Sequence, residues 1–237
     1  MSAIAPQKVL GILGGMGPAA SAEFMRLLAC RAPAEKDQEH PVVYLLSDPG
    51  IPDRTAAIEG TGDDPTKRLQ EGMEKLALWG ADILACPCNT AHVFIDRFAA
   101  SLPAPFLHIV EETVASARAK SPRGAWLLAT TGTIRSGLYA DCAQRCGYSF
   151  YAVEAQGQVQ RCVELVKAGE VVVAGELLRF LVEDLWRTRD VPVVTACTEL
   201  PLAYAASGLP AEKNVSSLAA LADACLAALY PGWRFAD

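Results

Sequence analysis

The chain has 237 residues, of which 51% are hydrophobic and 20% charged, with a net charge of −6. These proportions indicate a globular protein, and the length suits two small domains. The acidic balance, without any stripe of Lys and Arg, speaks against a nucleic acid partner. No apolar run approaches the roughly 18 residues of a membrane span, and residues 9–13 lack the basic start of a signal peptide. We therefore expect a cytoplasmic protein without a membrane partner.

Short apolar runs alternate with longer amphipathic segments along the whole chain. This alternation is typical of βα units and a mainly parallel sheet. We predict strands in six places, at residues 9–13, 42–46, 83–86, 125–129, 150–153 and 193–196.

Helices are predicted where capping residues and apolar spacing agree. Thr66 is a candidate N-cap, because the residues after it have the spacing of one buried helix face: Leu69, Met73, Leu76 and Ala77. Residues 177–185 repeat this spacing, and Gly169 is expected to end the helix before them. A last helix is expected over residues 218–229.

The two halves of the chain resemble each other in pattern. An apolar strand running into glycine opens both halves, at residues 9–15 and 124–132, and a cysteine at a strand end follows in each half. We predict an α/β fold with two similar Rossmann-like domains and mainly parallel sheets. Residues 1–108 plus 212–237 form the first domain and residues 109–211 the second, with the active site in the interdomain cleft.

Two cysteines end predicted strands and precede polar residues that start a helix. Cys88 and Cys197 should therefore lie at the carboxyl ends of parallel strands, where open α/β sheets place their sites. Two facing thiols can remove and return a proton on opposite sides of a carbon atom. Helix N-termini at Asn89 and Thr198 would favour the thiolate form, and N–H groups there, with the Asn89 and Thr90 side chains, would hold a carboxylate.

Two cofactor alternatives are weaker. Residues 15–20 fit a loose G-x-G-x-x-A dinucleotide motif, but no acidic residue ends a second strand about 20 positions later. We therefore favour a small-ligand or structural turn. A zinc site from Cys86, Cys88 and His92 has suitable ligand types but lacks a second Cys or His pair. We predict neither a metal nor another cofactor.

Five ordered motifs carry a resemblance to a known family. The chain, from about residue 8 to about 205, resembles the aspartate racemases of the aspartate/glutamate racemase superfamily. Glu199, after the second Cys-Thr, is similar to the aspartate branch. The motifs are Gly11-Ile12-Leu13-Gly14-Gly15-Met16-Gly17-Pro18, Ile51-Pro52-Asp53-Arg54, Cys86-Pro87-Cys88-Asn89-Thr90-Ala91-His92, Ala129-Thr130-Thr131-Gly132-Thr133 and Ala196-Cys197-Thr198-Glu199-Leu200-Pro201-Leu202.

The resemblance implies pyridoxal-independent racemisation of a small acidic amino acid, aspartate or also glutamate, often by a homodimer. Cys88 and Cys197 would be the catalytic acid and base. Arg54 and Lys167 would bind the side-chain carboxylate of the substrate. The full set of expected substrate-binding residues is Met16, Pro52, Asp53, Arg54, Asn89, Thr90, Ala91, Thr131, Lys167 and Thr198.

Two features depart from the family pattern. Family members tend to carry an acidic residue near the start of the last helix, where this chain has Asn214-Val215-Ser216, and Cys86 has no assigned role. Two other hypotheses stay open at this point. One is a superfamily isomerase or decarboxylase acting on a dicarboxylate, and the other is a non-catalytic protein that binds a dicarboxylate.

Overall fold

The computed structural model describes residues 6–230 and 232, and its strands form two four-stranded parallel sheets. The first sheet has the order β2-β1-β3-β4 and the second the equivalent order β6-β5-β7-β8. The repeated topology confirms the α/β class and the likeness of the two halves. The strands are β1 (Leu10–Gly14), β2 (Val43–Ser47), β3 (Ile83–Ala85), β4 (Phe106–Leu107), β5 (Ala125–Ala129), β6 (Phe150–Tyr151), β7 (Val193–Ala196) and β8 (Asn214–Ser216).

Helices connect the parallel strands, as parallel pairing requires. Those of the first half are α1 (Pro18–Arg31), α2 (Arg54–Ile58), α3 (Thr66–Leu78), α4 (His92–Ile95) and α5 (Ile109–Lys120). Those that follow β5 are α6 (Thr131–Arg135), α7 (Leu138–Arg145), α8 (Gln156–Lys167), α9 (Val171–Thr188), α10 (Leu200–Ala206) and α11 (Ser217–Leu229).

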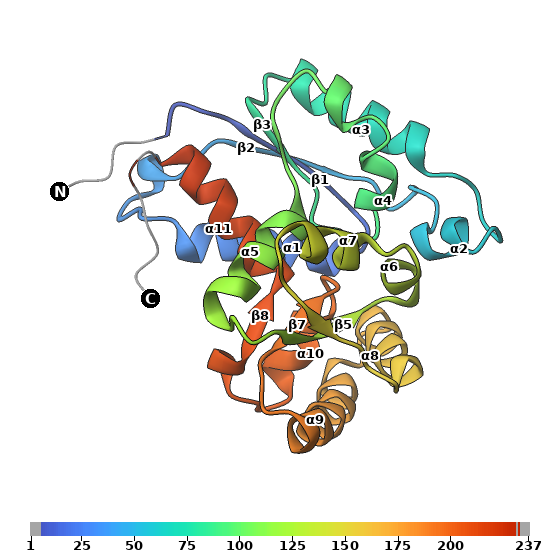
Figure 1. The fold of residues 1–237 in the computed structure, drawn as a ribbon. Coiled ribbons are helices and arrows are strands. Elements are labelled where there is room, and N and C mark those ends of the chain that lie inside the picture. Colours follow the sequence, from blue (N-terminus) through green and yellow to red (C-terminus); the bar gives the residue numbers. More distant parts are fainter. Residues whose placement is uncertain (1–5, 231, 233–237) are drawn as a thin grey trace.

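The two sheets lie on either side of a shared helical layer (Figure 1). Helices α1, α5, α7 and α11 lie between the sheets, whereas α3 covers the outer face of the first sheet and α8 to α10 that of the second. Because side chains alternate along a strand, Ile12 points into the central core and Leu13 into the outer core. Strands buried on both faces read as continuous apolar runs, which explains the prediction of the central strands β1, β3, β5 and β7.

Helix α11 joins the end of the chain to its beginning. It packs against α1 and α5 and is apolar nearly all round, as expected for a helix inside a core. The strand before it, β8, pairs with β7 in the second sheet. Residues 214–216 therefore lie with the second sheet, although the predicted segment 212–237 was assigned to the first domain.

Of two predictions about helix ends, one is confirmed and one is wrong. Gly169 follows α8 with a φ of +86°, as predicted for the residue that ends this helix. The Thr66 prediction is wrong by one position, because Thr66 is the first helical residue of α3 and Pro65 occupies the cap. Asp64 instead accepts a hydrogen bond from the Thr66 N–H at 2.8 Å.

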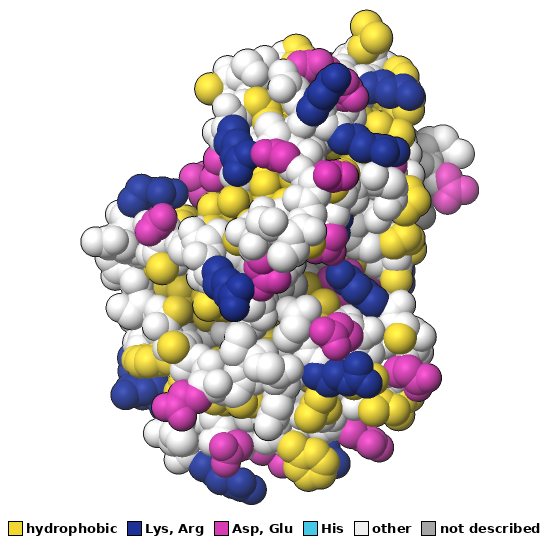
Figure 2. Space-filling view, turned by 90° about the vertical axis from the view of Figure 1, so that its right-hand side faces the viewer, with side chains coloured by type: hydrophobic (Ala, Val, Ile, Leu, Met, Phe, Trp, Pro, Cys, Tyr) yellow, Lys and Arg dark blue, Asp and Glu magenta, His cyan; other side chains and the backbone are white. Residues whose placement is uncertain are grey.

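The surface mixes charges of both signs. On the face in Figure 2, Lys and Arg side chains alternate with Asp and Glu side chains. In the described part of the chain, every helix is too short or too polar to cross a bilayer.

Candidate active site

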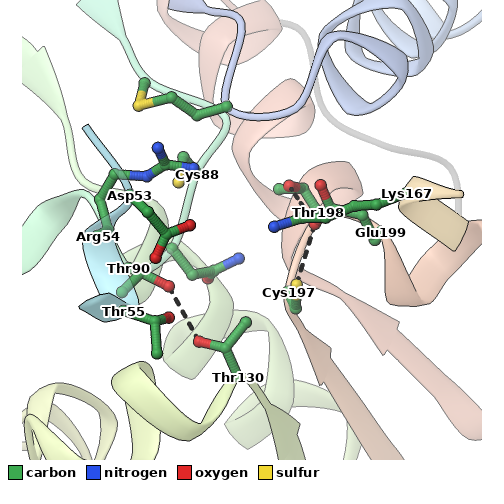
Figure 3. Close-up of a pocket in the computed structure, with 12 residues that line it drawn as sticks. Asp53, Arg54, Thr55, Cys88, Thr90, Thr130, Lys167, Cys197, Thr198 and Glu199 are labelled. Carbon is green, nitrogen blue, oxygen red and sulfur yellow. Dashed lines mark hydrogen bonds between the residues drawn. The ribbon is translucent and has the colours of Figure 1, made fainter. Parts of the chain in front are cut away.

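A pocket opens where the carboxyl ends of the two sheets approach each other. The space between its lining atoms is about 320 Å³ when the open solvent at its mouth is included. Cys88 and Cys197 reach it from opposite sides (Figure 3). Its lining comprises Met16, Asp53, Arg54, Thr55, Cys88, Asn89, Thr90, Thr130, Lys167, Cys197, Thr198 and Glu199.

The Cys88 loop is held by hydrogen bonds to the second half of the chain. A tight turn after β3, closed from the Cys88 N–H to the Cys86 carbonyl at 2.8 Å, brings the thiol to the pocket. Thr90 Oγ1 lies 3.0 Å from the hydroxyl of Thr130, which directly follows β5, and 2.9 Å from that of Thr133 in α6. The first cysteine loop is thereby tied to the opening loop of the other half.

Asn89 is fixed in orientation by two buried partners. Tyr139 donates from its hydroxyl to Asn89 Oδ1 at 2.6 Å, and burial raises the pKa of Tyr139, which keeps this hydroxyl protonated. Asn89 Nδ2 donates to Ser217 Oγ at 2.9 Å. An amide nitrogen carries two hydrogens, so one N–H of Asn89 remains for a ligand in the pocket.

The Cys197 loop is also bound to the opposite half of the chain, but through a carboxylate instead of hydroxyl groups. The Cys197 thiol donates to Glu199 Oε2 at 3.0 Å, and Glu199 Oε1 accepts from the Gly17 N–H at 3.3 Å. Gly17 lies in the loop after β1, so this loop too is tied to the opposite half. Burial and then the Glu199 carboxylate raise the pKa of Cys197, which favours its thiol form.

The glycine loop after β1 holds Glu199. A Cβ at position 17 would lie 3.2 Å from Glu199 Oε1, so glycine allows this approach. Gly15 has a φ of +93°, and its N–H donates to Ser21 Oγ at 2.9 Å. With the Gly17 N–H used by a carboxylate, the structure supports the structural-turn interpretation of the motif over the dinucleotide one.

A zinc site at Cys86, Cys88 and His92 does not fit the contacts of His92. Both nitrogens of its ring are hydrogen-bonded, to the Cys88 carbonyl and to the Ile109 N–H. Within the part of the chain that the structure describes, no three His, Cys, Asp or Glu side chains form a group suited to a metal ion.

Arg54 supplies positive charge on the Cys88 side of the pocket. Its Nη1 donates to the carbonyls of Ile51 at 3.2 Å and Pro52 at 3.0 Å, which anchors the guanidinium. Its Nε is buried and has no hydrogen-bond partner among the described residues. Burial opposes the charge, but Cys88 and Asp53 outweigh it and raise the pKa of Arg54. The guanidinium therefore stays charged beside Cys88.

Seven of the ten expected substrate-binding residues line this pocket together with both cysteines, and three do not. Pro52 lines a separate surface hollow that includes Asp48 and Arg68. Ala91 is fully buried in the outer core of the first sheet. Thr131 begins α6, and its N–H donates to Gln160 Oε1 at 3.1 Å. Each of the three adjoins a lining residue in sequence, but the chain turns it away.

Three lining residues were absent from the expected set. Glu199 was noted only as a family marker, although it follows a strand-end cysteine by two positions, as Thr90 does. Thr130 directly follows β5, so the rule that sites form at strand carboxyl ends would have found it. Thr55 lies in the short helix α2, and no pattern in the sequence marks it.

Comparisons with known proteins identify the family of the chain. Residues 13–225 match the family described as Asp/Glu/Hydantoin racemase. The chain is 30% identical over 200 residues to the broad-specificity amino-acid racemase RacX of Bacillus subtilis (strain 168), covering 81% of this chain and 86% of that protein.

Solved structures show the same relationship. The aspartate racemase of Picrophilus torridus is similar with a TM-score of 0.82 and 29% identity, covering 93% of each chain. A glutamate racemase of Thermus thermophilus shares the fold, with a TM-score of 0.67, 21% identity and coverage of 95% of this chain and 82% of that one. The chain therefore belongs to the Asp/Glu/hydantoin racemase family and is an amino-acid racemase, an isomerase of the Asp/Glu type.

Proposed function

We propose that this racemase interconverts L- and D-aspartate with Cys88 and Cys197 as the two proton-transfer groups. The observation that carries the proposal is the approach of these two thiols to one small pocket from opposite sides. Inversion at a carbon requires removal of the α-proton from one face and delivery of a proton to the other. Two acid–base groups on opposite sides meet this requirement without a cofactor.

The proposed reaction conserves protons at every step. For one enantiomer, the Cys88 thiolate takes the α-proton and the electron pair of the broken C–H bond passes into the α-carboxylate system. The Cys197 thiol then gives its proton to the other face of the carbon. For the opposite enantiomer the two cysteines exchange roles, so each direction leaves the enzyme in the starting state of the other.

The surroundings of the two cysteines favour one resting state. Arg54 places a positive charge beside Cys88, whereas Glu199 places a carboxylate 3.0 Å from the Cys197 sulfur. Opposite charge stabilises a thiolate and like charge destabilises it. We infer that the free enzyme carries a thiol at Cys197.

The lining groups suit an amino acid with a second carboxylate. The free N–H of Asn89 is a donor for the α-carboxylate, where negative charge grows as the proton leaves. Lys167 extends into the pocket from the Cys197 side (Figure 3) and makes no ion pair with any described residue. A side-chain carboxylate would give it a partner. The Picrophilus torridus aspartate racemase supports aspartate as the substrate.

Single substitutions of the two cysteines test the proposal. We expect Cys88→Ala and Cys197→Ala each to lower the rate of aspartate racemisation by about 10²- to 10⁴-fold, the usual contribution of one acid–base group. Chiral chromatography of both reaction directions measures this rate. Cys30→Ala is the matched control, because Cys30 is an exposed thiol on α1. Wild-type activity in either pocket variant would exclude the two-base scheme.

A further inference from the structure

His92 lies directly beneath the Cys88 loop and is fully buried. Its Nδ1 is 2.9 Å from the Cys88 carbonyl oxygen, and its Nε2 is 3.2 Å from the backbone nitrogen of Ile109. The rings of Phe106 and His108 pack against it, with centroid distances of 5.2 Å and 4.5 Å. The ring is therefore held from several sides and connects the cysteine loop to the start of α5.

These two contacts determine where the ring carries its proton. A backbone N–H only donates, so Nε2 must accept from Ile109 and carries no hydrogen. A carbonyl oxygen only accepts, so Nδ1 must carry the hydrogen and donate to Cys88. Burial also lowers the pKa of His92, which keeps the ring neutral. The ring thus donates to the Cys88 carbonyl as a neutral Nδ1–H tautomer.

Holding this carbonyl also sets the direction of the next N–H group. The peptide bond between Cys88 and Asn89 is trans and planar, so its C=O and N–H point in opposite directions. The Asn89 N–H therefore points away from the His92 ring. Among residues 6–230, nothing accepts a hydrogen bond from this N–H. This N–H is thus unpaired among the described residues, in a residue that lines the pocket beside Cys88.

We propose that His92 is a positioning residue for Cys88. Its Nδ1–H holds the Cys88–Asn89 peptide so that the thiol and the Asn89 N–H both point toward the substrate. This inference rests on the proposed function of Cys88. His92 touches neither substrate nor thiol, and it acts only through the backbone. Its other contact, to Ile109, anchors α5, so a purely structural role is the competing explanation.

Two substitutions separate these roles, because each retains one contact. In His92→Asn the side-chain amide nitrogen can occupy the place of Nδ1 and still donate to Cys88. In His92→Gln the longer side chain places its oxygen near Nε2, where it can accept from Ile109, and the donor to Cys88 is lost. Circular dichroism and thermal unfolding compare the folding of the two variants.

The measurements are kcat and KM for aspartate and the alkylation rates of Cys88 and Cys197 by iodoacetamide, from peptide mass spectrometry. We expect His92→Gln to lose roughly 10- to 100-fold in kcat, as small misplacements of reacting groups do, with a changed ratio of Cys88 to Cys197 alkylation. His92→Asn should recover most of both quantities. A Gln variant that behaves like the wild type, or an Asn variant no better than Gln, would overturn the proposal.

A measurement on the unmodified protein covers the case in which neither variant folds. Nitrogen-15 NMR of the histidine rings should show His92 neutral, with its proton on Nδ1. A proton on Nε2 would contradict the proposed donation to Cys88. The alkylation and NMR results do not depend on turnover, so a protein that meets both expectations but fails to racemise aspartate would refute the proposed substrate and leave the placement of His92 intact.

Discussion

Glu199 makes the two cysteine loops chemically different. At the equivalent position in the first loop stands Thr90, which binds the hydroxyls of Thr130 and Thr133. Glu199 instead receives hydrogen bonds from the Cys197 thiol and the Gly17 N–H. A single residue thus provides both a bridge between the halves and a negative charge beside one thiol. We expect this charge to give the two directions of the reaction different pH dependences.

Replacing Glu199 by Gln should shift the pH dependence of both directions. The substitution removes the charge that, after burial, raises the pKa of Cys197, so this pKa should fall. The direction that needs a Cys197 thiolate gains activity as pH rises through this pKa, and its rise should move to lower pH. The direction that needs the thiol should lose activity at lower pH than in the wild type. Initial rates for both enantiomers, from about pH 6 to 10, measure the rising and the falling pH profile.

Glu176→Gln on the exposed surface of α9 is the matched control for this loss of charge. It should leave both profiles in place. Profiles of Glu199→Gln that coincide with those of the wild type would show that the carboxylate does not influence Cys197.

At the scale of elements, the loop after β1 shows why glycine is needed at one position. Gly15 has a positive φ, and a Cβ there would lie 2.5 Å from the backbone of Asp48. Gly60 also has a positive φ, of +72°, but a Cβ there would meet nothing within 4 Å. The two glycines therefore share a conformational requirement and differ in the space around them.

Alanine substitutions at these two positions separate the cost of a left-handed backbone conformation from the cost of a clash with neighbouring backbone. Gly60→Ala should lower the free energy of unfolding by about 1 kcal/mol, the cost of a left-handed conformation. Gly15→Ala should lower it by about 3 kcal/mol or more, because a backbone clash is added. Urea unfolding followed by circular dichroism measures both values. Equal losses would show that the Asp48 backbone moves aside without cost.

Much of the architecture could be predicted, because strands buried on both faces leave long apolar runs in the sequence. The strands β4 and β8 could not, since β4 is a pair of apolar residues directly after a proline and β8 contains a single apolar residue, Val215. Both cysteines were placed at the pocket by their position after such runs. The contact between Glu199 and Gly17 joins residues 182 apart, and only the folded chain shows it. Ala91 was misplaced because the turn after Cys88 directs it into the core.

At the scale of the whole molecule, the two halves share their largest hydrophobic core. This core contains residues of β1 and β3 from the first sheet and of β5 and β7 from the second, with α11 among them. Both sides of the pocket are therefore fixed to one packed layer. The crosswise contacts of Thr90 and Glu199 add two direct connections between the halves at the pocket itself.

A shared core predicts that the molecule unfolds as one unit. Leu221 of α11 is fully buried in this core, and Leu221→Ala should cost about 2 to 5 kcal/mol of unfolding free energy. Circular dichroism and tryptophan fluorescence should report the same single transition in urea, for the wild type and for this variant. Leu76→Ala, in the outer core of the first sheet, is the comparison for a local cavity. Two separate transitions in the wild-type protein would show that the halves fold independently.

Proton NMR in D2O tests the proposed chemistry most directly. The purified, reduced protein is incubated separately with L-aspartate and D-aspartate, without pyridoxal phosphate or added metal. The two-base scheme predicts loss of the α-proton signal from each enantiomer, with the opposite enantiomer appearing on chiral analysis and carrying deuterium at the α-carbon. A folded protein that leaves both α-proton signals intact would contradict aspartate racemisation by Cys88 and Cys197.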